Sequence, residues 1–173
     1  SYSTNAGSSW NNNFPASGGW YNGCVAMSSN AAMTNTTVNV VFAPENAPVS
    51  YTANSGSSWA NSDFDCSTAG VQTKTPEEST KSYIPSRTIT SDKVTAGNFY
   101  AIVSNGFYRS TDNGATFCLQ KNLTDPNMPN GNTTSFNRAQ IKAAPGIAGF
   151  VLLAFGANAS GNKGFWRTTD GGT

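Results

Sequence analysis

The sequence predicts an all-β fold of β-propeller blades, because a turn motif recurs, strand-like runs separate its copies, and the spacing fits one blade. The motif is Ser/Thr-x-Asp/Asn-x-Gly-x-Ser/Thr-aromatic, called here the Asp-box or box. It occupies residues 3–10, 52–59 and 110–117, and a fourth copy begins at 168–173. The copies start 49, 58 and 58 residues apart. A closed propeller usually takes about four to eight blades. We therefore expect residues 1–173 to form one incomplete propeller of about three blades.

Each box is predicted to be a turn that holds itself together. An Asp or Asn side chain accepts N–H groups further along the turn, flanking hydroxyls do the same, and glycine supplies a positive φ. The closing aromatic side chain starts the next strand and covers the turn. Asn replaces Asp in two copies, and an amide cannot serve as general acid or nucleophile, so the acidic residues are interpreted as turn formers. The structural residues assigned to the boxes are Asn5, Gly7, Trp10, Asn54, Gly56, Trp59, Asp112, Gly114, Phe117, Asp170 and Gly172.

Between the boxes, each repeat holds two further strand-like runs. A third strand enters the box and is marked by aromatic or β-branched residues, as in Phe107 with Tyr108 and Phe165 with Trp166. A fourth strand leaves the box. The runs predicted as the first two strands are 23–28 and 37–43, 87–91 and 99–104, and 138–144 and 149–155. Four antiparallel strands per repeat make one propeller blade.

Composition excludes several classes of function. Ten Lys plus Arg against nine Asp plus Glu give neither a basic stripe nor an acidic tail, so no nucleic-acid partner is expected. Histidine is absent, which removes Ser-His-Asp and Cys-His catalysis and the commonest metal ligand. We assign no cofactor and no metal. The longest apolar run, 150–155, is too short to span a membrane.

Sequons and cysteines favour a secreted chain. Four N-glycosylation sequons lie in stretches predicted as loops, and they begin at Asn35, Asn122, Asn132 and Asn158. Three cysteines, Cys24, Cys66 and Cys118, lack metal-type spacing. One disulfide with a remaining thiol would suit an extracellular protein, whereas three buried thiols are the alternative. We predict an extracellular, glycosylated protein and leave the cysteine pairing open.

Two polar insertions, 61–85 and 121–135, are the expected places for substrate or partner contacts, because long insertions lie on propeller faces. The neighbouring Glu77 and Glu78 are interpreted as solvated, since adjacent residues in an extended loop point apart. Trp20 and Tyr21 lie among glycines just before a strand. They are candidate substrate-binding residues that would stack on a sugar, with plain packing as the alternative.

Five stretches carry a resemblance to a known family. They are 48–59, 92–101, 105–112, 142–146 and 165–172. In this order they resemble successive blades of glycoside hydrolase family 74, most closely the middle of its second propeller. Its members are secreted endo-xyloglucanases and chain-end-acting relatives with two seven-bladed propellers and a glucan cleft between them. The resemblance implies a β-glucan or xyloglucan partner, and it implies further blades in a longer polypeptide or in other copies.

The family's catalytic residues do not carry over to this chain. The resemblance implies an inverting reaction by two Asp residues, one from each propeller, whose carboxyl groups lie about 6.5–9.5 Å apart. Neither motif occurs here, and Asp63, Asp65, Asp92 and Asp125 have no matching context. We therefore assign no catalytic residue and expect scaffold and part of a cleft wall.

Other classes of propeller protein share the box. A non-catalytic, glycosylated structural or adhesive propeller is the main alternative, and sortilin-like receptors and sialidases are others. Sialidases need an arginine cluster to hold a carboxylate. The four arginines are better explained as blade residues, and they are Arg87, Arg109, Arg138 and Arg167.

Overall fold

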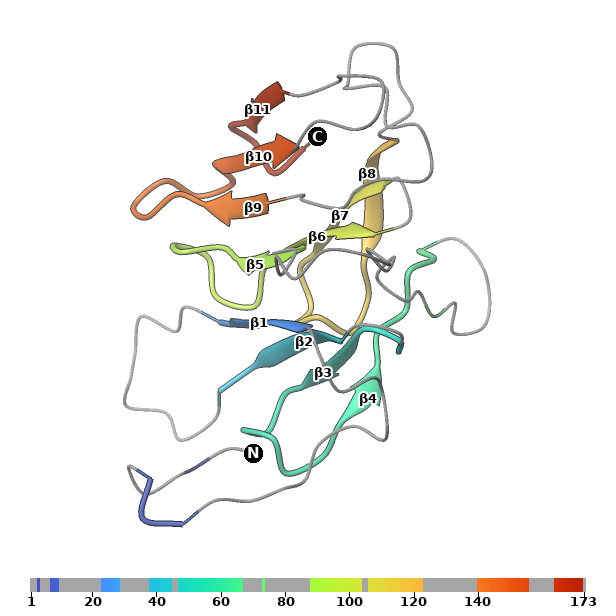
Figure 1. The fold of residues 1–173 in the computed structure, drawn as a ribbon, viewed down its shortest axis with the longest axis vertical. Helices are drawn as coiled ribbons and strands as arrows, with labels where there is room; N and C mark the ends of the chain where they lie inside the picture. The colour runs from blue at the N-terminus through green and yellow to red at the C-terminus, as the bar shows by residue number, and fades with distance from the viewer. Residues whose placement is uncertain are drawn as a thin grey trace.

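The computed structural model describes residues 3, 7–9, 23–28, 38–44, 47–66, 73, 88–103, 106–122, 140–155 and 164–172. All regular secondary structure in these ranges is β, in eleven strands and three antiparallel sheets (Figure 1). Sheet one contains β1 (Gly23–Met27), β2 (Val40–Pro44), β3 (Ser50–Thr52) and β4 (Ala60–Asn61). Sheet two contains β5 (Ile89–Ser91), β6 (Phe99–Val103), β7 (Gly106–Ser110) and β8 (Cys118–Asn122). Sheet three contains β9 (Gln140–Ala143), β10 (Val151–Phe155) and β11 (Gly164–Thr168).

Strands follow one another within each sheet as antiparallel neighbours, in the orders β1-β2-β3-β4, β5-β6-β7-β8 and β11-β10-β9. The three sheets stack in chain order, with β1, β5 and β9 as neighbours across the sheet boundaries (Figure 1). This arrangement confirms the predicted propeller blades. Predicted strand ends agree to within a few residues. The largest shift is in the run 37–43, whose strand is Val40–Pro44.

The middle sheet is covered on both faces, which is why β6 is buried along its whole length. Successive side chains of a strand point to opposite faces. Tyr108 of β7 packs toward sheet one and Phe107 toward sheet three. Two apolar cores result. The larger is formed by Ala26, Val41, Ala43, Val49, Phe64, Ile89, Phe99, Ala101, Val103, Tyr108 and Phe117. The smaller is formed by Tyr100, Ile102, Phe107, Ile141, Val151 and Leu153, with Trp166 packed against it.

The segment after β4 crosses from sheet one to sheet two. The N–H of Asp63 donates to Ala115 O (2.8 Å), and Asp63 O accepts the N–H of Phe117 (2.7 Å). Phe64 is 5% exposed and stacks on Phe117. The predicted insertion 61–85 therefore begins with residues that belong to the sheets, because Phe64 supplies the apolar anchor. Likewise, Lys121 and Asn122 belong to β8 and not to the second insertion.

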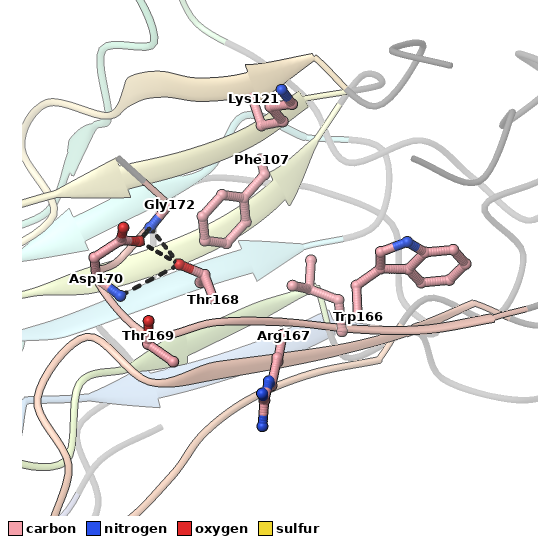
Figure 2. Close-up of a pocket in the computed structure, with 9 residues that line it drawn as sticks. Phe107, Lys121, Trp166, Arg167, Thr168, Thr169, Asp170 and Gly172 are labelled. Carbon is pink, nitrogen blue, oxygen red and sulfur yellow. Dashed lines mark hydrogen bonds between the residues drawn. The ribbon is translucent and has the colours of Figure 1, made fainter. Parts of the chain in front are cut away.

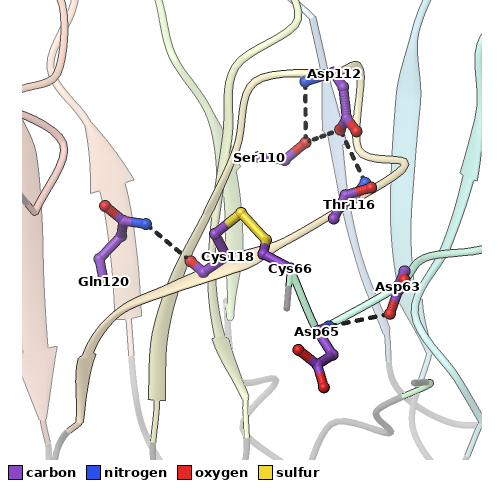
Figure 3. Close-up of a disulfide and its surroundings, with 8 residues drawn as sticks. All are labelled: Asp63, Asp65, Cys66, Ser110, Asp112, Thr116, Cys118 and Gln120. Atoms are coloured by element: carbon purple, nitrogen blue, oxygen red, sulfur yellow. Dashed lines mark hydrogen bonds between the residues drawn. A yellow bond between two sulfur atoms is a disulfide. The ribbon is translucent and has the colours of Figure 1, made fainter. Parts of the chain in front are cut away.

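A disulfide closes this crossing segment onto sheet two (Figure 3). It joins Cys66 to Cys118 on β8, across 52 residues of sequence. Cys24 on β1 retains its thiol, half-buried and 3.4 Å from Thr88 Oγ1. Of the two arrangements left open by the sequence, the structure therefore has one disulfide and one thiol.

No helix in the described part of the chain has the length and apolar character needed to cross a membrane.

Candidate functional site

The box corners share one set of hydrogen bonds. In the third box, Ser110 Oγ donates to Asp112 Oδ1 (2.8 Å) and accepts the N–H of Gly114 (3.0 Å). Asp112 Oδ1 also accepts the N–H of Thr116 (2.8 Å), as Figure 3 shows. One oxygen of the Asp112 carboxylate is therefore engaged in hydrogen bonds within its own turn.

The other boxes use the same positions. In the second box, Asn54 Oδ1 accepts the hydroxyl of Thr52 (2.8 Å) and the N–H of Ser58 (2.9 Å). In the fourth box, Asp170 Oδ1 accepts the hydroxyl of Thr168 (2.6 Å), and Thr168 Oγ1 accepts the N–H of Gly172 (2.8 Å), as the box hydroxyl does in the second and third boxes. An amide oxygen and a carboxylate oxygen therefore fill one role.

The second, third and fourth corners each contain two consecutive residues with positive φ, where the sequence indicated only one. The box glycines have φ of 90° at Gly7, 87° at Gly56, 89° at Gly114 and 96° at Gly172. The residues just before the last three also have positive φ, at Ser55 (59°), Asn113 (66°) and Gly171 (78°). Asn and Gly tolerate this conformation, whereas Ser carries no such signal. The sequence could therefore have indicated the second position in two of the three corners.

That second positive-φ residue ties the corner to the start of the sheet's second strand. The N–H groups of Ser55, Asn113 and Gly171 donate to backbone oxygens at 3.1, 3.0 and 2.8 Å. The acceptors are Val38, Gly97 and Gly149 in the same order. The box thus holds the residues just before the second strand as well as its own turn.

Box glycines also lie against the preceding sheet. A Cβ built at Gly114 would clash with the side chain of Val41 and lie 3.3 Å from Tyr51 Cβ. A Cβ at Gly172 would clash with the ring of Phe107. Glycine at this position is therefore required by the neighbouring sheet and not only by φ.

A cavity of about 460 Å³ lies between sheets two and three, next to the fourth box (Figure 2). Phe107, Leu153 and Trp166 give it apolar walls, and Lys121 and box residues line its polar part. The Asp170 carboxylate is turned toward Thr168 and Gly172. The walls of the cavity therefore suit an apolar ring. The Asp170 carboxylate that borders it is already engaged in hydrogen bonds within the fourth box.

A second cavity, of about 670 Å³, runs along the first strands of the three sheets. Lys93 and Lys142 are the charged residues among the described residues that line it. Lys93 Nζ donates to Ser91 Oγ (2.8 Å). Within the described ranges, no three of the side chains that usually bind metals come together.

Among the acidic residues that the structure describes, Asp92 has the most buried carboxylate, and the residue is 1% exposed. Its oxygens accept the N–H groups of Val94 (2.7 Å), Thr95 (2.8 Å) and Gly149 (2.9 Å) and the hydroxyl of Tyr100 (2.8 Å). Burial raises the pKa of Asp92, but these donors outweigh it and hold the pKa below its ordinary value. Asp92 therefore joins the turn after β5 to the turn before β10 and is unsuited to donate a proton.

Burial raises the pKa of the Tyr100 hydroxyl well above its ordinary value, and the hydrogen bond to Asp92 raises it further. The phenol therefore stays protonated and remains a donor to the carboxylate at neutral pH.

Two other acidic residues lie on the crossing segment. Asp63 is half-buried, and its Oδ1 accepts the N–H of Asp65 (3.0 Å), as Figure 3 shows. This local turn accounts for one oxygen of Asp63.

Several predicted site residues can be compared with the structure. Asn122 is exposed and is the last residue of β8, whereas we expected its sequon in a loop. It ends an edge strand and is exposed, so its place in a strand still leaves it accessible. The candidate platform of Trp20 and Tyr21 lies outside the described residues. So do Asn5, Trp10, Asn35, Asn132 and Asn158.

Sequence comparison identifies related proteins, although no family model matches. The chain is 33% identical over 157 residues to Xyloglucanase Xgh74A of Acetivibrio thermocellus strain ATCC 27405, and equally to the same-named protein of Acetivibrio thermocellus without a stated strain. The alignment covers 89% of this chain and 14% of the relative, so the chain spans about one seventh of that length.

One solved structure is also similar, a glycoside hydrolase family 74 enzyme of Niastella koreensis. It has a TM-score of 0.46 and 22% identity over 78% of this chain and 16% of that chain.

Proposed function

We propose that this chain is a segment of a secreted hydrolase of xyloglucan or a related β-1,4-glucan, in which it provides scaffold and part of a glycan-cleft wall. The chain is a propeller segment similar to glycoside hydrolase family 74. One observation supports the proposal above the others: identity to a xyloglucanase runs through nearly the whole chain, across all three sheets.

A scaffold role agrees with the use of the described carboxylates. Asp92 is enclosed by N–H donors, and Asp112 and Asp170 hold their own corners. An inverting glycosidase needs an acid and a base with room for a water between them. The chemistry is therefore assigned to parts of the full protein other than these residues.

Secretion is supported by the Cys66–Cys118 disulfide, since disulfides persist in oxidising compartments. Asn122 is exposed and accessible to a glycosyltransferase, and we propose it as an occupied sequon. Expression through a eukaryotic secretory pathway tests this proposal. Asn122→Gln should remove one increment of glycan mass, and an unchanged mass contradicts occupancy.

A segment exchange tests the hydrolase proposal. The aligned part of Xyloglucanase Xgh74A is replaced by this chain, and xyloglucan hydrolysis is measured. We expect activity to persist, because the catalytic residues come from the rest of that enzyme. A matched chimaera carrying Phe64→Asp, which disrupts the packing between sheets one and two, should lose hydrolysis. A folded chimaera that neither binds nor cleaves xyloglucan contradicts the proposal, as does turnover by isolated residues 1–173.

The alternative is a non-catalytic, extracellular structural or adhesive propeller. It is favoured by the same engagement of the Asp92, Asp112 and Asp170 carboxylates in structural hydrogen bonds. In that case the chimaera would fold and lack hydrolysis, while the isolated chain would still fold.

A further inference from the structure

The residue that follows the first strand of a sheet has the same place in sheets one and two. It is Ser28 after β1 and Asp92 after β5. Its N–H donates to the backbone oxygen of the residue just before the second strand. The distance is 2.8 Å from Ser28 to Asn39 and 2.9 Å from Asp92 to Asn98. Ser28 and Asp92 therefore close equivalent turns in successive sheets.

From this position the side chain reaches the next sheet. Ser28 Oγ accepts the N–H of Gly97 in sheet two (3.2 Å). Asp92 Oδ2 accepts the N–H of Gly149 in sheet three (2.9 Å). Gly97 and Gly149 are equivalent, because the backbone oxygen of each accepts an N–H from the box corner of its own sheet. One hydrogen bond thus links sheets one and two, and its counterpart links sheets two and three.

The two acceptors differ in chemistry. The Ser28 hydroxyl has no charge to lose, whereas a carboxylate that binds a proton becomes a donor at one of its oxygens. The oxygens of Asp92 also accept the N–H groups of Val94 and Thr95 and the hydroxyl of Tyr100. All of these groups are donors, so a proton on Asp92 has to displace one of them or the N–H from sheet three.

Few groups near Asp92 change charge between neutral and acid pH. The turn 144–150, which receives the hydrogen bond, has no titratable side chain. Among the groups on the surrounding elements, only the carboxylates change charge in this range. Asp170 is exposed and bonds within its own box, so Asp92 is the buried group that acid can change. The other groups are Tyr100 on β6, Arg109 on β7, Lys142 on β9 and Lys93 in the same turn as Asp92.

We propose that Asp92 is an acid-sensitive latch between sheets two and three, which opens at a higher pH than the link that Ser28 makes between sheets one and two. Opening releases the N–H of Gly149. It also loosens the fourth box, because Gly149 O accepts the N–H of Gly171 (2.8 Å). The latch belongs to the fold and does not depend on the proposed hydrolysis of a glucan.

Acid opens the latch because the closed form binds the proton less readily than the open form. Burial raises the pKa of Asp92, but its hydrogen bonds outweigh burial and keep the pKa of the closed form below the ordinary 3.8. In the open form the donors turn to water and the pKa returns to its ordinary value. The latch is therefore fully closed above the ordinary pKa and weakens as pH falls through the lower value.

Amide hydrogen exchange of residues 1–173, followed by NMR at a series of pH values, tests the proposal. Each rate is divided by the intrinsic rate at the same pH, so that the protection factor reports local opening. We expect the protection of Gly149 and Gly171 to fall by up to about tenfold per pH unit below the ordinary pKa of Asp92. Gly97 and Asn113, at the equivalent places in sheet two, should keep their protection to a lower pH.

Two variants distinguish the latch from general acid unfolding, and circular dichroism confirms that each is folded. Asp92→Asn cannot take up the proton, so Gly149 should then lose protection together with Gly97. Tyr100→Phe removes one donor and raises the pKa of Asp92, so Gly149 should open at a higher pH than in wild type. Loss of packing at Tyr100 alone would instead change the protection of Gly149 at every pH. Lys93→Gln is the matched control and should leave the order of opening unchanged.

Three results overturn the proposal. The first is a wild-type chain in which Gly149 and Gly97 lose protection at the same pH. The second is a folded Asp92→Asn variant in which Gly149 still opens before Gly97 in acid. The third is a folded Tyr100→Phe variant in which Gly149 opens at the wild-type pH.

Discussion

Phe64 stacks on Phe117 across the boundary between sheets one and two, with ring centroids 4.8 Å apart and planes 8° from parallel. Phe64 comes from the segment after β4, whereas Phe117 closes the third box. Phe64 also meets Tyr108 edge to face at 5.1 Å. A residue that follows one sheet is therefore part of the next sheet's core.

Phe64→Ala should lower the free energy of unfolding by about 3–5 kcal/mol, because it leaves a cavity beside two aromatic rings. Urea unfolding followed by fluorescence measures the change. Leu119→Ala is the matched control, since Leu119 is 53% exposed and its loss should cost less than about 1 kcal/mol. Equal losses of unfolding free energy in the two variants would show that the packing between sheets one and two does not depend on Phe64.

Reduction of the Cys66–Cys118 disulfide should lower the free energy of unfolding by about 2–4 kcal/mol, because it releases a long loop in the unfolded chain. The measurement is urea unfolding with and without a reductant. Cys24→Ser should keep the sensitivity to reductant, whereas Cys66→Ser with Cys118→Ser should lose it. A double variant that still responds to reductant would assign the effect to another group.

The sequence predicted the blades because their signals are local. The box places its hydrogen-bonding groups within a few residues of one another, and strand residues such as Phe107 and Phe165 mark the approach. The contacts of the crossing segment could not be predicted, because they join residues far apart, as in Asp63 with Thr116. The positive φ of Ser55 had no local signal either, since Ser rarely adopts it and the hydrogen bonds that accompany it are made with Val38, 17 residues away.

Glycine 114 offers a test that separates backbone strain from packing. Gly114 and Gly146 have similar φ, 89° and 81°, but a Cβ meets Val41 at the first and nothing within 4 Å at the second. Both Ala variants should lose about 1–2 kcal/mol to the left-handed backbone. Gly114→Ala should lose about 1–3 kcal/mol more from overpacking. Chemical unfolding of both variants gives the difference, and equal losses would refute the packing requirement.

Asp92 should make stability depend on acid pH. Its folded pKa lies below the ordinary 3.8, so the unfolded chain binds the proton more readily. The stabilisation is therefore fully present above the ordinary pKa and is lost as pH falls through the lower folded value. Free energies of unfolding for wild type and Asp92→Asn, measured from neutral to strongly acid pH, should converge as pH falls. Lys93→Gln, at an exposed neighbouring position, is the control. The prediction is contradicted if the free energies of unfolding of wild type and Asp92→Asn differ by the same amount at neutral and at strongly acid pH.

The role of Asp112 can be separated from catalysis by two substitutions at one position. Its Oδ1 acts as an acceptor for Ser110 and Thr116, and Asn54 fills the equivalent place in the second box. Asp112→Asn should therefore stay within about 0.5 kcal/mol of wild type, whereas Asp112→Ala should lose about 1–2 kcal/mol with the acceptor. Introduced into the xyloglucanase chimaera, Asp112→Asn should leave hydrolysis unchanged, because an amide keeps the corner and cannot transfer a proton. Loss of hydrolysis in a stable Asp112→Asn chimaera would make Asp112 a reacting group and refute the turn-former interpretation.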